Sequence, residues 1–213
     1  MPAVRNKAST RTPRKHERLP VTVRSLTPDL WAAFEDLFGP TGVCGGCWCM
    51  YWRIGSRYQR RPGTENRKDF LSVVRNGPPP GLLAFEGARA VGWCQVTPRN
   101  DLAFLERAPR LQPLPPGPVW SVSCFYIRRG YRRRGVSEAL LAGAIEHARA
   151  AGAPALEAYP SDVELAKGPQ PVYTGVASMF TRRSSCPWKR LTTPSVCPTE
   201  AAAPHLRDSA QSG

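Results

Sequence analysis

The sequence predicts an α/β domain in which helices flank a mixed sheet, and three observations support this fold class. Val119–Ile127 is rich in β-branched and aromatic residues, as expected of a strand buried on both faces. A helix-patterned stretch begins at Val136 and leads to a short apolar stretch at 155–159, which is typical of a strand–helix–strand unit with parallel strands. Two alternating stretches, 81–85 and 90–96, lie on either side of a short turn and predict an antiparallel hairpin.

The chain before the hairpin is expected to contain one strand and two helices. Residues 1–20 carry scattered basic residues and prolines with little to bury, as in a disordered tail. Residues 21–25 alternate as a short strand. Thr27-Pro28 is a helix-start signal, with the threonine as N-cap and the proline in the first turn, and the glycine at 39 ends this helix. A second helix is expected over 66–74.

The remainder of the chain is expected to contain the central strand, its helix, one further strand and a last helix that starts near Tyr173. Residues 98–118 are rich in proline and predict an irregular connection. The central helix has apolar positions at helical spacing and ends at Gly152. Residues 182–213 are poor in apolar residues and show no periodicity, so they predict a disordered or aberrant C-terminal tail without closing strands. The folded domain is therefore predicted to span 21–181.

The formal net charge of +14 makes nucleic-acid binding an alternative function. However, the basic residues are concentrated in the two terminal stretches and in the turn 128–135, which favours solvated tails and a local anion site over a specific nucleic-acid interface. Seven cysteines without a secretory leader favour a cytoplasmic chain with reduced thiols over a disulfide scaffold. No apolar stretch has the length needed to cross a membrane, so no membrane partner is expected.

The basic turn between the central strand and the central helix has the composition of a phosphate site. Amides at a helix start have no intrahelical partner, and the helix dipole adds positive potential there. Gly135 has no Cβ, so a ligand can approach the backbone closely, and the arginines offer charge-assisted hydrogen bonds. An ordinary strand–turn–helix unit with solvated arginines is the alternative. The sequence contains no G-x-G-x-x-G, which argues against a dinucleotide fingerprint.

This turn, Tyr131-Arg-Arg-Arg-Gly-Val-Ser137, resembles the pyrophosphate loop of the GNAT family of acetyl-CoA-dependent N-acetyltransferases. That loop reads Gln/Arg-x-x-Gly-x-Gly/Ala between a strand and a helix. Arg132 and Gly135 fit the pattern, and Ser137 stands where Gly or Ala is usual. The order of elements over 21–181 is also the order of that family. The resemblance implies a GNAT-like mixed, mostly antiparallel sheet whose central parallel strands splay apart, flanked by helices.

The resemblance also implies an enzyme that transfers the acetyl group of acetyl-CoA to an amine of a small molecule or a protein, by direct attack in a ternary complex. The central strand would hold the pantetheine arm and the turn would hold the pyrophosphate. The cofactor-binding residues are then Phe125, Tyr126, Ile127, Arg132, Arg133, Arg134, Gly135, Val136 and Ser137. The backbone N–H of Phe125 would stabilise the developing oxyanion. The sequence does not single out a general base.

The chain departs from the family pattern after its last predicted helix. Tyr173 and Phe180 stand where the family commonly has a cofactor-binding Asn and the Tyr that protonates the leaving thiolate. Phe180 has no hydroxyl, so Tyr173 is the remaining candidate acid, and packing over the strand end is its alternative role. The usual Gly-Phe and closing strands are not recognisable beyond Phe180, which predicts a divergent or frameshifted C-terminus. A catalytically impaired acyl-CoA-binding module therefore remains an alternative function.

The stretch Cys44-Gly-Gly-Cys-Trp-Cys-Met-Tyr-Trp52 is the most unusual local feature of the sequence. Its C-x-x-C-x-C pattern offers three soft ligands for zinc, with Cys94 or Cys124 as a fourth, or alternatively a redox pair. The sequence has no second C-x-x-C to complete a zinc site, and the motif does not stand in a thioredoxin-like setting. The favoured interpretation is therefore a wall of the acceptor pocket with no metal, formed by Trp48, Met50, Tyr51 and Trp52.

Overall fold

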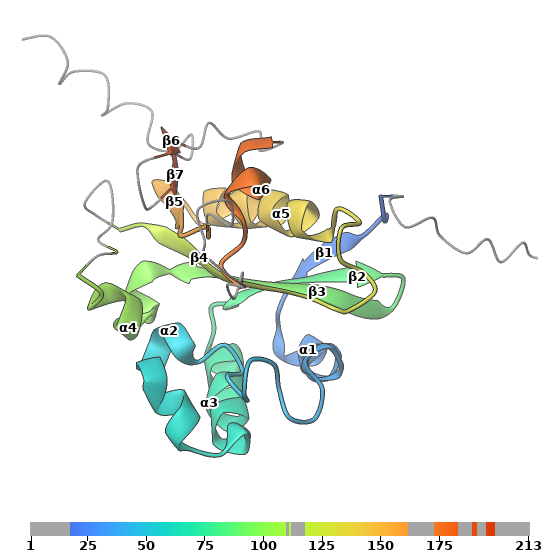
Figure 1. The fold of residues 1–213 in the computed structure, drawn as a ribbon, viewed down its shortest axis with the longest axis vertical. Coiled ribbons are helices and arrows are strands. Elements are labelled where there is room, and N and C mark those ends of the chain that lie inside the picture. The colour runs from blue at the N-terminus through green and yellow to red at the C-terminus, as the bar shows by residue number, and fades with distance from the viewer. Residues whose placement is uncertain are drawn as a thin grey trace, which may run out of the picture.

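The computed structural model describes residues 18–109, 111, 118–161, 173–182, 189–190 and 195–198. Its strands are β1 (Thr22–Ser25), β2 (Gly81–Glu86), β3 (Arg89–Pro98), β4 (Trp120–Ile127), β5 (Ala155–Ala158), β6 (Lys189–Arg190) and β7 (Ser195–Pro198). They form one mixed sheet in the order β1-β2-β3-β4-β5-β7-β6 (Figure 1). The pair β4–β5 is parallel and the other described pairs are antiparallel, which confirms the predicted fold class.

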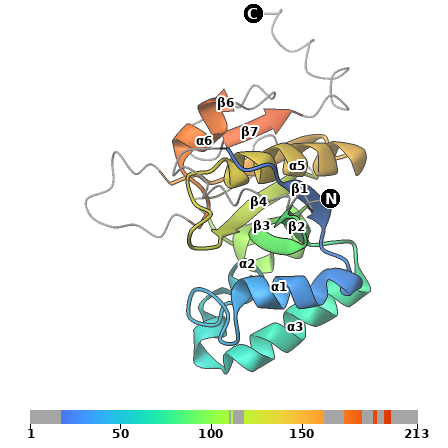
Figure 2. The ribbon, with the colours of Figure 1, turned by 90° about the vertical axis from the view of Figure 1, so that its right-hand side faces the viewer.

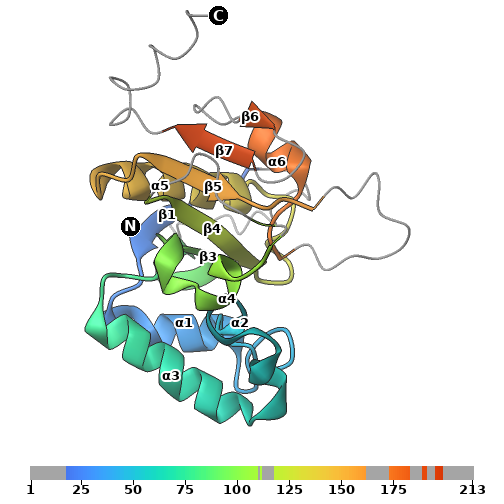
Figure 3. The same cartoon turned by 90° about the vertical axis from the view of Figure 1, so that its left-hand side faces the viewer.

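Helices cover both faces of this sheet (Figures 2 and 3). The helices are η1 (Pro28–Leu30), α1 (Trp31–Phe38), α2 (Tyr51–Ile54), η2 (Gly55–Arg60), α3 (Gly63–Asn76), η3 (Arg99–Asp101), α4 (Ala103–Glu106), α5 (Val136–Ala150) and α6 (Ala177–Arg182). Helices α1 and α3 lie against one face, and α5 lies against the other (Figure 3). The connection 98–118, which was predicted to be irregular, contains two short helical segments, η3 and α4.

The two faces have different cores. On the face of α1 and α3, aromatic rings dominate, and Phe34 lies 5.3 Å from Phe70 and 5.0 Å from Trp93 between ring centroids. On the opposite face, α5 buries its apolar stripe, including Leu140 and Ile145, against the sheet. Each fully buried side chain of this size contributes roughly 1.5–3 kcal/mol, so the sheet is held firmly on both sides.

Strands β4 and β5 pair over only part of their length. Trp120, Ser121 and Val122 of β4 pair with β5, and no pair with β5 is found for Ser123–Ile127. The two strands therefore splay apart as expected. A segment that begins at Tyr173 lies beside β4 and beside the chain that follows β5. Phe125 donates its backbone N–H to the carbonyl of Tyr173 at 2.5 Å, and Ser161 forms an isolated parallel bridge with Val176.

The C-terminal part of the sheet corrects the prediction that closing strands are missing. Strand β7 pairs antiparallel with β5, and β6 pairs with β7. Leu141 and Ile145 of α5 are buried, 3% and 1% exposed, and Cys197 of β7 belongs to the same core cluster. The helix predicted near Tyr173 begins instead at Ala177. Most of the predicted tail 182–213, like most of 1–20, lies outside the described residues.

The described cysteines are mostly free thiols. The free thiols among the described residues are those of Cys44, Cys47, Cys49, Cys94 and Cys124. Cys197 is disulfide-bonded, which departs from the expectation of fully reduced thiols. Within the described ranges, no helix has the length and apolar character of a membrane span.

His147 gives the fold a predicted pH dependence. Its ring packs edge-on against Trp120 at 5.5 Å, and its buried Nε2 has no hydrogen-bond partner among the described residues. Burial lowers the pKa of His147 below its usual value of 6.5. The unfolded chain therefore binds this proton more readily, so the free energy of unfolding is expected to fall as pH drops below about 6.5.

The test is denaturant unfolding of the wild type and His147→Phe between pH 8 and pH 5. Phenylalanine keeps the ring contact with Trp120 and cannot be protonated. We expect the variant to lose less stability than the wild type over this range. Parallel curves would contradict a contribution from His147.

Candidate active site

The turn between β4 and α5 has the backbone geometry of an anion site. Gly130, Arg133 and Gly135 have positive φ angles of 93°, 60° and 82°. Gly135 is the N-cap of α5 in a left-handed conformation, which explains the glycine there. The amide of Ala139 donates an α-helical hydrogen bond to the carbonyl of Gly135 at 3.0 Å. The three amides that precede Ala139 in the helix therefore have no intrahelical acceptor. These amides and the helix dipole favour an anion.

Arginines surround this helix start without forming ion pairs among the described residues. They are Arg129, Arg132, Arg133 and Arg134. Arg132 donates Nε to the carbonyl of Ile127 at 3.3 Å, and the Arg134 guanidinium lies over the Tyr131 ring at 5.6 Å. The Nε of Arg134 is buried and has no hydrogen-bond partner in the described part of the chain. The turn therefore carries uncompensated positive charge, which suits a pyrophosphate.

A cavity of about 520 Å³ runs from this turn along the splayed end of β4. It is lined by Val43, Cys44, Phe125, Tyr126, Ile127, Arg132, Ser137, Tyr173, Gly175, Val176 and Met179. Five of the predicted cofactor-binding residues therefore line one cavity. Arg133, Arg134, Gly135 and Val136 do not line it, and the side chain of Val136 is in the α5 core. Any contact of Val136 with a ligand would be through its backbone.

The predicted oxyanion donor is engaged in this structure. The backbone N–H of Phe125 donates to the carbonyl of Tyr173. The Phe125 ring packs edge-on against Phe180 at 6.4 Å, and Phe180 is only 2% exposed. The amide of Phe125 therefore stabilises the segment that begins at Tyr173, and it cannot serve an oxyanion until that bond is exchanged.

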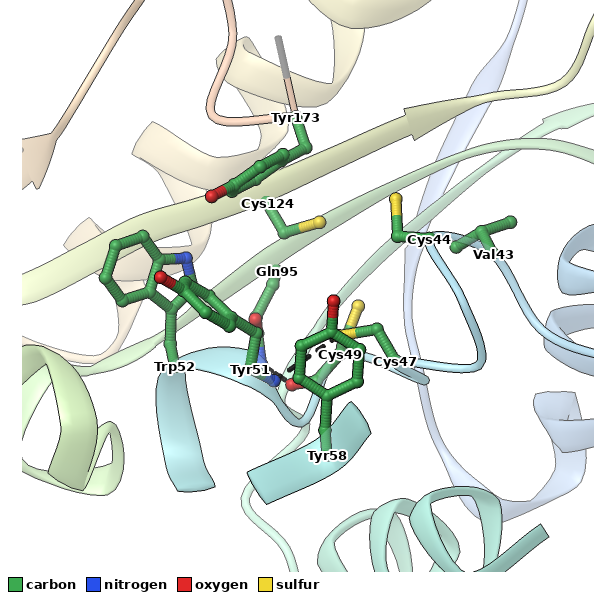
Figure 4. A pocket seen from close by; sticks show the side chains of 10 residues that line it. All are labelled: Val43, Cys44, Cys47, Cys49, Tyr51, Trp52, Tyr58, Gln95, Cys124 and Tyr173. Carbon is green, nitrogen blue, oxygen red and sulfur yellow. Dashed lines mark hydrogen bonds between the residues drawn. The ribbon is translucent and has the colours of Figure 1, made fainter. Parts of the chain in front are cut away.

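A second cavity, of about 140 Å³, adjoins the first (Figure 4). It is lined by Val43, Cys44, Cys47, Cys49, Tyr51, Trp52, Tyr58, Gln95, Cys124 and Tyr173. Val43, Cys44 and Tyr173 line both cavities, so the two meet at these residues. Figure 4 shows the Tyr173 ring approaching from the side opposite Tyr51 and Tyr58.

The structure corrects the predicted pocket wall. Tyr51 and Trp52 line the small cavity, with the Trp52 indole N–H donating to the carbonyl of Ser123 at 2.9 Å. Trp48 and Met50 do not, because they are buried in the aromatic core, 2% and 5% exposed. The sequence places all four residues close together, but it does not determine the direction in which each side chain points.

Two further residues that line the small cavity were not predicted from the sequence. Tyr58 lies in η2, within a stretch that also carries Arg57 and Arg60. Gln95 lies in β3 and is 0% exposed. It donates Nε2 to the Cys49 carbonyl at 3.2 Å and accepts from the Ser123 hydroxyl at 3.0 Å. A glutamine within an otherwise apolar strand is a signal that could have identified this position.

The cysteine loop has a strained backbone that contacts with the rest of the fold hold in place. Cys44, Trp48 and Cys49 have positive φ angles of 51°, 46° and 59°. Non-glycine residues rarely adopt this conformation, and it costs about 1–3 kcal/mol each unless the surroundings impose it. Part of the restraint comes from Trp93, which donates its indole N–H to the Cys49 sulfur at 3.0 Å. The loop thereby presents Cys44, Cys47 and Cys49 to the cavity opposite Cys124.

The thiols of this loop are held in their neutral form. Burial raises the pKa of the Cys44 thiol, raises that of Cys47 to about 12, and raises that of Cys49 well above its usual value. Metal ligation and redox chemistry both use the thiolate. No group of three or more potential ligands in the described part of the chain is placed to hold a metal ion.

We predict that the purified chain carries no stoichiometric zinc or iron. A zinc ion would have to displace several protons from thiols whose pKa burial has raised. The measurement is elemental analysis of protein purified without chelator. A value near one metal ion per chain would contradict this prediction and return Cys44, Cys47 and Cys49 to the role of ligands.

The comparisons with known proteins agree with this architecture. A sequence model of the acetyltransferase (GNAT) family matches residues 45–166, which is more than half of the chain. The match includes residues 45–49 of the cysteine loop, β4, the basic turn and α5. The chain belongs to the GNAT acetyltransferase family. No curated protein matches the chain at a significant level.

Solved structures with a similar fold share little sequence with this chain. A GCN5-related N-acetyltransferase from Kribbella flavida is 16% identical with a TM-score of 0.42, over 68% of this chain and 31% of its own. A GNAT family acetyltransferase from Streptococcus agalactiae is 17% identical with a TM-score of 0.43, over 67% and 76%. The polyamine N-acetyltransferase of Drosophila melanogaster is 11% identical with a TM-score of 0.44, over 68% and 78%. This chain spans about a third of the length of the Kribbella protein.

Proposed function

We propose that this chain transfers the acetyl group of acetyl-CoA to an amine of a small molecule or a protein, by direct attack in a ternary complex. One observation carries the proposal. A cavity that ends at an arginine-rich helix start adjoins a smaller aromatic cavity, and Cys44 and Tyr173 line both. A donor and an acceptor held in adjoining cavities react as if at very high local concentration, which lowers the barrier by about 7–11 kcal/mol in the best cases.

Acetyl-CoA is assigned to the larger cavity. Its pyrophosphate would lie at the start of α5, near Ser137 and Arg132, where helix amides and an unpaired guanidinium favour negative charge. Its pantetheine arm would follow Phe125 and Ile127 along the edge of β4 that is not paired with β5. The thioester would then reach the junction of the two cavities beside Tyr173.

Tyr173 is the proposed proton donor to the leaving thiolate. Burial raises the pKa of its phenol to about 12, so the hydroxyl stays protonated throughout the neutral range. Its backbone carbonyl accepts from the Phe125 amide. For that amide to stabilise the oxyanion, the thioester oxygen must replace the Tyr173 carbonyl, so we expect acetyl-CoA binding to shift the backbone at Tyr173.

The same hydrogen bond favours a second candidate function, an acyl-CoA-binding module with impaired catalysis. If the Tyr173 carbonyl keeps the Phe125 amide when acetyl-CoA is bound, the tetrahedral intermediate lacks that donor. Loss of one such donor costs about 10²–10³ in kcat. The module is distinguished from the enzyme by acetyl-CoA that binds without CoA release in the presence of a wide panel of amines.

Replacing Tyr173 with phenylalanine is expected to lower kcat by about 10² while acetyl-CoA binding persists, because the variant keeps the ring and loses the acid. CoA release should be measured by chromatography, since the thiols of this chain would react with a thiol dye. Tyr51→Phe is the matched control, because its ring packs edge-on against Tyr173 at 6.2 Å but lines only the small cavity. Equal losses in the two variants would contradict the assigned role.

A further inference from the structure

The small cavity has an unusual wall for an amine site. Its described lining consists of four thiols, three phenols, one indole, one amide and one valine side chain. They come from the loop before α2, from α2, η2, β3 and β4, and from the segment that begins at Tyr173. Among these described lining residues there is no carboxylate, imidazole, ammonium or guanidinium.

Five of the seven titratable groups that face the cavity are held in their protonated form, and none of the seven is a carboxylate or an imidazole. Burial raises the pKa of Cys44, Cys47, Cys49, Tyr58 and Tyr173, which keeps these groups protonated and uncharged. Cys124 and Tyr51 complete the titratable set. The neighbouring cation on α2, Arg53, directs Nη1 to the carbonyl of Asp101 and does not line the cavity. An acceptor therefore enters an environment whose described lining holds no carboxylate, imidazole, ammonium or guanidinium.

This environment penalises a strongly basic amine twice. An alkylamine with a pKa like that of lysine, about 10.4, is neutral in only about one molecule in 2,500 at pH 7. The charged remainder would lose its hydration in the cavity without a carboxylate to compensate, and the described lining holds no carboxylate or imidazole to remove its proton. An amine whose nitrogen lone pair is delocalised into an aromatic ring is already neutral at pH 7 and needs neither group.

The size and shape of the cavity also suit one aromatic ring. An apolar protein cavity of about 150 Å³ binds benzene, and this one measures about 140 Å³. The ring of Tyr51 contacts Trp52 edge-on at 4.8 Å, Tyr58 at 5.9 Å and Tyr173 at 6.2 Å. Aromatic rings prefer such offset or edge-on neighbours, at about 0.5–1.5 kcal/mol for each pair.

We infer that the acceptor is a weakly basic aromatic amine carried on a single ring, an inference that rests on the proposed function. The amine nitrogen attacks the thioester carbon, the C–N bond forms, and the C–S bond breaks. The nitrogen loses one proton and the leaving thiolate gains one, through the Tyr173 hydroxyl, which donates to sulfur and recovers a proton from nitrogen. The products are an N-acetylated arylamine and CoA, with no further reactant.

The test compares aniline, benzylamine and spermidine as acceptors for the wild-type chain with acetyl-CoA, with CoA release followed by chromatography. We expect kcat/KM at pH 7 to be at least tenfold higher for aniline than for either alkylamine. Between pH 6.5 and 8.5, kcat/KM for aniline should change little, whereas that for benzylamine should rise with pH as its neutral fraction grows.

A charge placed in the cavity provides a second measurement. Cys124→Asp is expected to lower the ratio of kcat/KM for aniline to kcat/KM for benzylamine at least tenfold. Acetyl-CoA binding, measured by calorimetry, shows whether the variant is folded. Ser72→Asp adds the same charge on the exposed surface of α3 and should leave the wild-type preference in place. If Cys124→Asp does not fold, the three amines tested on the wild type still decide the question.

The outcomes separate the acceptor class from the proposed function. Acetyl-CoA-dependent turnover that favours benzylamine or spermidine would overturn the aromatic-amine inference and leave the acetyltransferase proposal intact. Unchanged aniline turnover in folded Cys124→Asp would overturn the assignment of the acceptor to this cavity. Failure of acetyl-CoA to bind, or binding without CoA release from any amine, would overturn both.

Discussion

Replacing Arg99 with alanine is expected to lower the free energy of unfolding by about 3–5 kcal/mol, because it leaves a buried carboxylate without its cation. Arg99 and Glu157 are 3% and 0% exposed. The Arg99 Nη1 lies 2.6 Å from Glu157, and its Nη2 donates to the carbonyls of Leu105 and Leu111 at 3.1 and 2.6 Å. A domain with about 5–15 kcal/mol of stability would lose a large share of it.

This network of hydrogen bonds and ion pairs connects β4 and β5 near the end of their pairing. Glu157 belongs to β5, and it accepts a hydrogen bond from Ser121 of β4, directly opposite it in the parallel register. Arg99 also reaches Tyr159, just after β5, and pairs with Glu106 of α4 at 2.6 Å. The last ladder pair before the splay, Val122–Ala158, follows immediately. We therefore expect loss of Arg99 to weaken acetyl-CoA binding as well.

Chemical denaturation of Arg99→Ala measures this effect. Arg149→Ala is the control, because Arg149 forms an i,i+3 pair with Glu146 on the exposed side of α5, where such pairs contribute about 0–1 kcal/mol. The double variant Arg99→Met/Glu157→Leu removes both buried charges and should be more stable than Arg99→Ala. A loss below about 1 kcal/mol in Arg99→Ala would contradict a structural role for the network.

Replacing Gly135 with aspartate is expected to weaken acetyl-CoA binding by well over tenfold. A unit charge 4 Å from a phosphate costs about 1 kcal/mol in water and about 4 kcal/mol in the environment of a protein surface, and tenfold corresponds to about 1.4 kcal/mol. The left-handed backbone at Gly135, with φ of 82°, adds strain for any other residue. Space is not the obstacle, since a Cβ there would meet only Arg18 at an ordinary 3.6 Å.

The matched control for this variant lies at the other end of α5. Gly152 also has a positive φ, 71°, and a Cβ there would meet nothing within 4 Å. Gly152→Asp therefore introduces the same charge and comparable backbone strain away from the anion turn. Calorimetric titration should give a near-wild-type Kd for Gly152→Asp. Equal affinity in the Gly135 and Gly152 variants would remove the pyrophosphate assignment.

The elements that were predictable from sequence are those determined locally. The hairpin of β2 and β3, the strand–turn–helix unit around Gly135 and the parallel strand β5 follow from short-range periodicity and turn residues. The family resemblance rested on this unit, and Gly130 and Gly135 both have positive φ angles in its turn. The short segments η3 and α4 within 98–118 were not predicted because the prolines there suggest an irregular connection. The role of Arg99 was not predicted either, because its partner Glu157 is far away in sequence.

The remaining errors come from contacts that are distant in sequence or from unusual backbone angles. Trp48 and Tyr51 are three residues apart, yet the positive φ angles in the cysteine loop send one into the core and the other into the cavity. The backbone hydrogen bond from Phe125 to Tyr173 joins two residues that are far apart in sequence. Strand β7 is short, and among the described strands it pairs with β5, which is distant in sequence, and with the still shorter β6, so no periodicity reveals it.

Hydrogen–deuterium exchange with and without acetyl-CoA tests the central claim most directly. The amides at the start of α5 precede the first α-helical hydrogen bond of that helix, so they should exchange rapidly in the free protein. We predict that saturating acetyl-CoA slows exchange in the segment 125–138, with the largest change at the amides that follow Gly135. No protection in that segment, or protection confined to the cysteine loop 43–49, would contradict the assignment of this turn as the acyl-CoA site.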